Sequence, residues 1–112
     1  MTRLSTHVLD VSQGRPAAGV SVVLEMDVSG SWKTLAHAST NSDGRLANLL
    51  DETKLTCGSY RLLFDVGSYF RQAKIKSFYT IVPVQFEVED PAQQYHVPLL
   101  LSPFGYSTYR GS

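Results

Sequence analysis

Seven residues of this chain have side chains or backbone properties that could serve acid–base chemistry at a carbonyl group. They are His7, Arg45, His96, Tyr109, Arg110, Gly111 and Ser112. An imidazole titrates near physiological pH and can therefore act as a base or an acid. A guanidinium is a planar, always charged fork of donors that matches the C=O and N–H edges of a flat heterocycle. Amide hydrolysis needs a base for water, a donor for the developing oxyanion and an acid for the leaving nitrogen.

Each of these residues also has a plain structural explanation. A single histidine in a strand often has no functional role, and an arginine that follows a turn, such as Arg45, is commonly solvated. Tyr109 and Arg110 would fit an edge strand equally well. His37 has no motif around it, and we expect it on the surface. Three widely spaced histidines could ligate zinc, but the local His and Cys spacing of a typical zinc site is absent, so we predict neither a metal nor a cofactor.

The end of the chain predicts two strands that are held in place rather than frayed. An apolar run with one histidine covers residues 95–101, and Ser-Pro-Phe-Gly separates it from a run rich in tyrosine and threonine. An aromatic chain end of this kind would normally be buried in a sheet. The guanidinium of Arg110 and the terminal carboxylate therefore need a polar setting, and a binding cleft would provide one.

The rest of the chain predicts short strands separated by turns. Alternating apolar and polar residues mark half-buried strands, and Gly44 in Asn41-Ser42-Asp43-Gly44 is expected to take a positive φ that aims Arg45. One short helix is predicted near residues 67–73, with Ser68 as its cap. Residues 49–56 are a connection of undetermined structure. The predicted strands before the C-terminal pair cover residues 4–11, 20–26, 32–39, 60–64 and 82–88.

Composition limits the class of protein. The 112 residues are 43% hydrophobic, which predicts one folded domain over residues 1–112 rather than a disordered chain. The net charge of zero gives no electrostatic reason to expect a nucleic acid or a membrane as partner. Cys57 is the only cysteine, and the start lacks the apolar core of a signal peptide. We therefore expect a cytoplasmic protein.

Four motifs, in this order, give the chain a specific resemblance. Residues 4–10 read LSTHVLD, residues 43–45 read DGR, residues 95–103 read YHVPLLLSP and residues 109–112 read YRGS. Together they resemble the 5-hydroxyisourate hydrolases, transthyretin-like enzymes of urate breakdown. The resemblance covers nearly the whole chain, although Thr80 stands where we would expect the family's proline.

About eight short strands with a single helix favour an all-β sandwich over an alternating β/α fold. The resemblance implies the transthyretin-like form of that sandwich, with two four-stranded sheets. It also implies an enzyme that hydrolyses 5-hydroxyisourate to 2-oxo-4-hydroxy-4-carboxy-5-ureidoimidazoline without a metal, in a homotetramer with its sites at a subunit interface.

The resemblance assigns roles to the seven residues. It implies that His7, Arg45, His96 and Ser112 are catalytic, with Arg45 on substrate oxygens, the two imidazoles activating and placing water, and Ser112 in the surrounding hydrogen-bond network. It implies that His7, Arg45, Tyr109, Arg110 and Gly111 bind the substrate. Which imidazole is the base stays open at this point.

Two other classes of function remain as alternatives. One is a small-molecule carrier resembling transthyretin, which shares the sandwich and binds its ligand without chemistry; the YRGS ending and the two histidines argue against it. The other is a β-sandwich interaction module, whose mark would be an exposed apolar patch unrelated to the histidines and Arg45.

Overall fold

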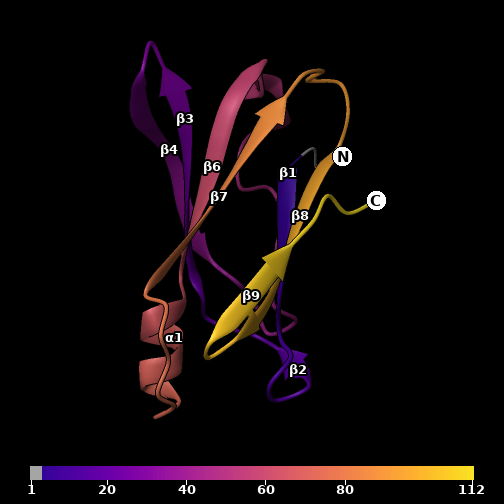
Figure 1. Cartoon of the computed structure of the whole chain (residues 1–112). Coiled ribbons are helices and arrows are strands. Elements are labelled where there is room, and N and C mark those ends of the chain that lie inside the picture. Colours follow the sequence, from indigo (N-terminus) through magenta and orange to yellow (C-terminus); the bar gives the residue numbers. More distant parts are fainter. Residues whose placement is uncertain (1–3) are drawn as a thin grey trace.

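Two β-sheets pack face to face, and a single α-helix lies at one end of the sandwich (Figure 1). The computed structural model describes residues 4–112, with the exception of the Glu52 side chain, so the first three residues of the predicted domain lie outside it. Within that range the elements are β1 (Leu4–Asp10), β2 (Arg15–Pro16), β3 (Ser21–Val28), β4 (Ser31–Ser39), β5 (Arg45–Leu46), the 3-10 helix η1 (Glu52–Lys54), β6 (Gly58–Asp65), α1 (Val66–Gln72), β7 (Ile81–Val88), β8 (Tyr95–Ser102) and β9 (Gly105–Thr108).

The sheet topology confirms the predicted β-sandwich and adds one short strand to it. One sheet has the order β4-β3-β6-β7, with antiparallel neighbours throughout. The other has five strands, in the order β2-β1-β8-β9 with β5 also on β1, where four were expected. The two-residue strands β2 and β5 both fit because they pair with different parts of β1, at Leu9 to Asp10 and at Thr6 to His7. Strands β1 and β8 run parallel.

The helix begins one residue earlier than predicted, and Ser68 is not its cap. Asp65, at the end of β6, accepts hydrogen bonds from the backbone N–H of Ser68 at 3.1 Å and from its hydroxyl at 2.8 Å. An aspartate in this position satisfies a helix N–H that lacks a partner within the helix, so Asp65 is the cap. Among residues 4–112, no helix combines the length and apolar character needed to cross a membrane.

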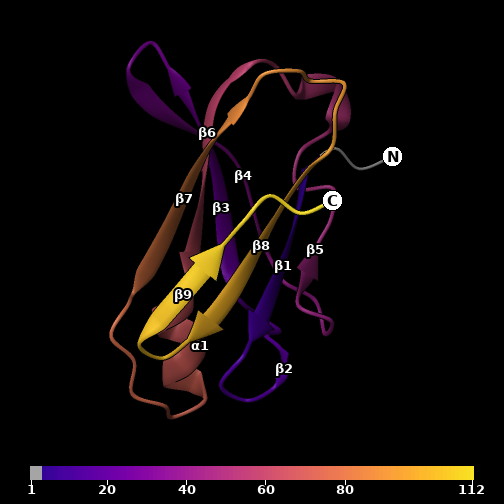
Figure 2. The same cartoon turned by 45° about the vertical axis from the view of Figure 1, so that its right-hand side comes forward.

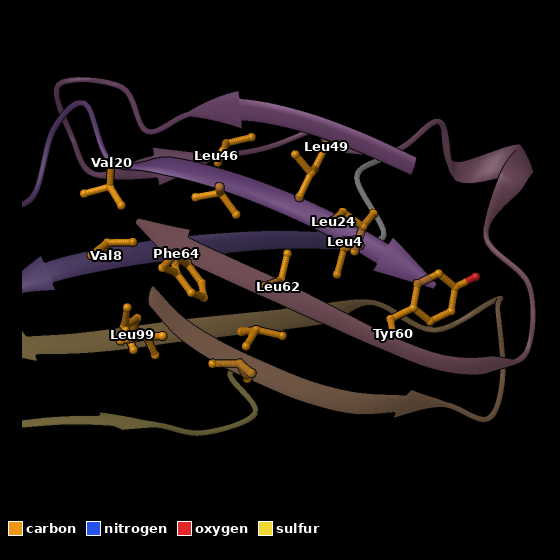
Figure 3. Packing of buried hydrophobic residues seen from close by; sticks show 14 of the residues in the cluster. Leu4, Val8, Val20, Leu24, Leu46, Leu49, Tyr60, Leu62, Phe64 and Leu99 are labelled. Atoms are coloured by element: carbon orange, nitrogen blue, oxygen red, sulfur yellow. The ribbon is translucent and has the colours of Figure 1, made fainter. Parts of the chain in front are cut away.

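The core fills the space between the sheets, mainly with alternate residues of β1, β3, β6, β7 and β8. Tyr60, Leu62 and Phe64 of β6 are fully buried and meet Leu24 of β3 and Leu99 of β8 (Figure 3). The same period of two applies to β1, where buried and half-buried residues alternate along the strand. Every second residue of β1 and β8 therefore faces away from the core, onto the outer surface of the five-stranded sheet.

A buried carboxylate joins the end of β1 to helix α1. Asp10 is 0% exposed and accepts hydrogen bonds from Ser12 Oγ at 2.6 Å, Gln13 N at 3.2 Å, Gln13 Nε2 at 2.8 Å and Tyr69 OH at 2.8 Å. Burial raises the pKa of Asp10, but the hydrogen bonds from Ser12, Tyr69 and Gln13 outweigh it and bring the pKa below its usual 3.8. Burial and the neighbouring Asp10 raise the pKa of Tyr69 to about 12, so its hydroxyl stays a donor at neutral pH.

Replacing Asp10 should change how stability depends on pH. Because its folded pKa is depressed, the ionised carboxylate stabilises the fold above the unfolded pKa of about 3.9, and this contribution is lost as the pH falls. Asp10→Asn should cost about 1–3 kcal/mol at neutral pH, since the amide turns an N–H₂ toward groups that are already donors. Urea unfolding at pH 7 and at a pH well below 3.8 should show a smaller pH dependence in the variant than in the parent. The exposed Glu89→Gln variant serves as the control, and an equal loss in both variants would contradict the assignment.

Candidate active site

The outer face of the five-stranded sheet brings together both motif histidines and Arg45. Parallel pairing of β1 with β8 sets Ser5 beside His96, and antiparallel pairing of β1 with β5 sets His7 opposite Arg45. Ser5, His7 and His96 are half-buried and Arg45 is exposed. Residues almost ninety positions apart in the sequence thus share one surface, because β8 returns to lie beside β1 (Figure 2).

Arg45 is held at this surface by the turn that precedes it. The side chain of Asn41 accepts hydrogen bonds from the backbone N–H groups of Asp43 and Arg45, at 2.9 and 3.0 Å. Gly44 has φ +72°, as predicted, and a Cβ there would lie 2.3 Å from the carbonyl oxygen of Val8. Only glycine fits this buried position, where the turn docks onto β1. Within the described part of the chain the guanidinium itself makes no hydrogen bond or ion pair, so its donors are free to bind a ligand.

His7 is oriented by the same turn. Its Nε2 lies 2.9 Å from the carbonyl oxygen of Asp43. A backbone carbonyl can only accept a hydrogen bond, so Nε2 carries a proton. In the neutral ring this assigns the lone pair to Nδ1.

His96 lies in a setting that favours its neutral form. Its Nδ1 is 2.8 Å from the hydroxyl oxygen of Ser5. Burial, followed by the positive charges of His7 and Arg45, lowers the pKa of His96 below its usual 6.5, and a hydrogen bond with the Ser5 backbone offsets this in part. At neutral pH His96 is therefore an uncharged imidazole next to a cationic guanidinium.

The segment after β9 crosses β8 at His96. The N–H of Gly111 donates to the carbonyl oxygen of His96 at 2.7 Å, forming an isolated bridge. This contact confirms the expectation of an anchored chain end. The need for glycine is steric here, because its φ is outside the left-handed region. A Cβ on Gly111 would lie 2.4 Å from His96 Cδ2 and 3.3 Å from Pro98 Cγ.

The other three residues of the terminal motif do not reach the imidazoles. Arg110 donates to Gln93 Oε1 at 3.0 Å and to the carbonyl oxygen of Gln94 at 3.2 Å, and its guanidinium lies 4.6 Å from the centre of the Tyr95 ring. Tyr109 is 57% exposed. Ser112 is exposed, and within residues 4–112 it forms no hydrogen bond with His7, Arg45 or His96. Their predicted roles in substrate binding and catalysis stay predictions.

A separate hollow of about 230 Å³ lies where the edges of the two sheets come together. Phe86, Tyr95, Tyr109 and Arg110 are among the residues that line it, but His7, Arg45 and His96 are not. The two motif histidines and Arg45 therefore lie on the outer face of the sheet rather than in this hollow. In the described residues no group of three or more His, Cys, Asp or Glu side chains is arranged to hold a metal ion. His37 is exposed on β4 of the other sheet, as expected.

Ser5 and the carbonyl group of Asp43 are the two direct hydrogen-bond partners of the imidazoles, and neither was predicted. Both lie inside motifs that carry the family resemblance, residues 4–10 and 43–45. The period of two along β1 was a usable sign that Ser5 and His7 share a face. The register that sets Ser5 next to His96 depends on long-range pairing and has no local signal.

Adding one methyl group at Gly111 should move His96. In Gly111→Ala, either the imidazole or the terminal segment must shift, because 2.4 Å is far shorter than any carbon–carbon contact between unbonded groups. The ring ¹H and ¹³C shifts of His96 in NMR spectra should change. Gly105→Ala is the matched control, since its Cβ would meet only Ser102 Oγ at 3.7 Å. Unchanged His96 signals in Gly111→Ala would show that the segment does not sit against the ring.

Comparison with known proteins agrees with the motifs in the sequence. The profile of the HIUase/Transthyretin family matches residues 4–111. A curated 5-hydroxyisourate hydrolase of Halalkalibacterium halodurans is 50% identical over 116 residues, which cover 98% of this chain and 98% of that protein.

Solved structures of two functional types share the fold. The 5-hydroxyisourate hydrolase of Klebsiella pneumoniae superposes with a TM-score of 0.85 at 39% identity, covering 97% of this chain and 98% of that one. Sea bream transthyretin in complex with thyroxine gives a TM-score of 0.92 at 30% identity, covering 97% and 94%. The TM-score with transthyretin is at least as high as that with the hydrolase, so the fold alone does not separate the two functions. The sequence identity is higher with the hydrolase. This chain belongs to the HIUase/Transthyretin family.

Proposed function

We propose that this chain, as one domain, hydrolyses 5-hydroxyisourate to 2-oxo-4-hydroxy-4-carboxy-5-ureidoimidazoline in urate breakdown. The observation that carries the proposal is the gathering of two imidazoles and an unpaired guanidinium on one sheet face. The relative that is 50% identical over its whole length bears the name of this enzyme. The residue types on the face are those that opening a cyclic amide requires.

In this mechanism we assign the role of general base to His96, where the sequence had left the choice between the two imidazoles open. Its lowered pKa keeps it neutral at pH 7, so it can take a proton from water. The water oxygen attacks the ring carbonyl carbon at the bond to N1, and Arg45 donates hydrogen bonds to the oxyanion that forms. The C–N1 bond then breaks, N1 receives the proton from His96, and the carbonyl becomes the product's carboxylate.

The remaining residues position the substrate. His7, held through Nε2 by the carbonyl of Asp43, presents its other ring nitrogen to water or substrate. Gly111 permits the terminal segment to lie against His96 and so forms one wall of the site. We propose that Tyr109 and Arg110 bind the substrate, as the terminal motif predicts, and that Ser112 belongs to the hydrogen-bond network around the imidazoles. We also propose a cytoplasmic location, since a single cysteine suits a reducing compartment.

The carrier remains the alternative function. Sea bream transthyretin, which is named as a complex with thyroxine, shares the fold at 30% identity. A carrier has no use for a neutral imidazole beside a guanidinium, and the YRGS ending, with its glycine seated on His96, resembles the hydrolases.

Ultraviolet monitoring of freshly generated 5-hydroxyisourate tests the proposal directly. We expect the substrate band to decay much faster with the protein than without it, and the rate to be unchanged after treatment with a chelator. Decay at the spontaneous rate would reject the enzyme and favour the carrier. A rate that is lost with chelator and restored by zinc would reject the metal-free mechanism.

Two substitutions of Arg45 should separate its geometry from its charge. Arg45→Lys keeps a cation but loses the planar fork, so turnover should fall on the order of a hundred- to a thousandfold, the usual effect of losing an oxyanion donor. Arg45→Gln also removes a charge that lowers the pKa of His96. Its turnover should fall in the same way, and the acidic limb of its kcat/KM profile should move to higher pH.

The sign of that shift follows from the neighbouring charge. Without the cation of Arg45, the protonated form of His96 is easier to form, so the pKa of His96 rises. The neutral form of His96, which acts as the base, is therefore lost at a higher pH than in the parent protein. Arg45→Lys should leave the limb in place. The exposed Lys33→Gln variant, on the other sheet, controls for a general change in net charge. Wild-type turnover in both Arg45 variants would return Arg45 to the role of a solvated turn residue.

We further propose that the enzyme is a homotetramer with its sites at a subunit interface. The outer face that carries His7 and His96 also carries half-buried Leu9 and Leu100, which are register partners in the sheet. Two sheet edges, β7 and β9, end the strand order and are open to a further strand. Symmetric self-association would cover both the apolar face and the edges.

A charge on the apolar part of this face should break the tetramer. Leu100→Lys should dissociate the protein, as measured by light scattering at assay concentration, because a buried ammonium without a partner is costly. Activity should fall along with the mass, while circular dichroism stays native, since Leu100 is only half-buried within the subunit. The control is Lys33→Glu, a charge change on the opposite sheet. A fully active monomer would contradict the proposed position of the sites.

A further inference from the structure

We propose that Ser5 is a positioning residue for catalysis: its hydroxyl accepts the Nδ1 proton of His96 and thereby leaves the Nε2 lone pair free to act as the base. The Oγ to Nδ1 distance is 2.8 Å. This role rests on the proposed function of His96, although the hydrogen bond and the tautomer that it selects can be measured without any substrate.

The two side chains meet because the strands that carry them are held in one register. Ser5 and His96 are Cα partners in the parallel pair of β1 and β8, and both side chains face outward from the core. The next pair along, Thr6 and Val97, is fixed by a buried hydrogen bond of 2.6 Å from Thr6 Oγ1 to the Val97 carbonyl. A shift in the register of the two strands would break that bond, so the sheet keeps Ser5 beside His96.

His96 is also restrained on the side away from β1. Gly111 donates its N–H to the His96 carbonyl at 2.7 Å and lies against Cδ2, the ring carbon bonded to Nε2. The backbone of His96 is thus fixed by β1 on one side and by the terminal segment on the other. What stays adjustable is the rotation of the ring and the placement of its proton, and the Ser5 hydroxyl acts on both.

A hydroxyl can donate or accept, so the direction of the bond follows from what each ring nitrogen can reach. Nδ1 is engaged by the Ser5 hydroxyl at 2.8 Å, which leaves Nε2 as the nitrogen that can take a proton from water. A base needs its lone pair at that nitrogen, so the single proton of the neutral ring belongs on Nδ1. The Ser5 hydroxyl then accepts from Nδ1–H.

The surrounding charges keep this tautomer neutral. His7 on β1 and Arg45 on β5 both lower the pKa of His96, in addition to burial. The cation of the terminal segment, Arg110, is directed to Gln93 and Gln94 and not to the imidazole. A neutral ring with a defined donor side and a defined acceptor side is the form that a general base requires.

The test combines NMR of the free protein with kinetics. In ¹⁵N-labelled protein above the pKa of His96, the ring nitrogen shifts should report a single Nδ1–H tautomer. Ser5→Ala should give a mixture of tautomers and a lower His96 pKa, and it should reduce kcat about tenfold with little change in KM. Raising the pH should not restore the rate, because the defect lies in orientation rather than in protonation.

Two further variants separate this role from a general effect on the strand. Ser5→Thr keeps the hydroxyl and suits a strand, so it should restore both the tautomer and the turnover. Ser39→Ala removes an exposed hydroxyl from the other sheet and should change neither.

The outcomes distinguish failure of this inference from failure of the proposed function. A protein that is inactive on 5-hydroxyisourate but has a single Nδ1–H tautomer, lost in Ser5→Ala, would reject the function while supporting the contact. An active protein whose His96 is protonated on Nε2 would overturn the proposal, and so would a Ser5→Ala variant with unchanged tautomer, pKa and kcat.

Discussion

The parallel pairing of β1 with β8 is the constraint on which the candidate site depends. These strands come from opposite ends of the chain, and their register alone decides which residue lies beside His96. A shift by one residue would turn every side chain of a strand to the opposite face. The buried bond from Thr6 to Val97 and the apolar inward positions of both strands exclude such a shift, so the chemistry of the outer face is specified by the packing of the inner one.

Strand β1 is the shared support of the site. It pairs with β8 along its whole length and with β2 and β5 over two residues each, so the turn that carries Arg45 and the segment that carries His96 are positioned from the same strand. At its end, Asp10 connects it to α1 through Tyr69. The three ionisable groups of the site lie on β1 and on the two strands that pair with it, β5 and β8, rather than on separate loops, which suits a reaction that needs fixed geometry.

The sandwich and most of its strands could be predicted from the sequence because they follow from local patterns, and the motifs pointed to His7, Arg45 and His96, which the structure brings onto one face. The alternation of apolar and polar residues predicted β3 and β7, and the turn at Gly44 and its positive φ were also predicted correctly. The helix start was misplaced because Asp65 is both the last residue of β6 and the cap of α1, whereas the pattern ended the strand at Phe64 and offered Ser68 as the cap. The orientation of Arg110 was beyond reach, since its partners Gln93 and Gln94 lie in a loop with no motif. Ser5 was visible as part of a motif, but its contact with His96 joins residues 91 positions apart.

The alternation along β1 gives neighbouring residues of a single strand two different roles, one in folding and one at the site. Leu4, Thr6 and Val8 hold the sheets together, while Ser5 and His7 face the site, and no residue of this stretch serves both purposes. We therefore expect substitutions of Ser5 or His7 to alter the outer face at little cost in folding free energy, and substitutions of Leu4, Thr6 or Val8 to do the reverse. Such a scaffold can lose one activity and acquire another without passing through an unstable intermediate. Its family contains both hydrolases and a thyroxine-bound transthyretin on nearly the same backbone, as this independence of the two faces allows.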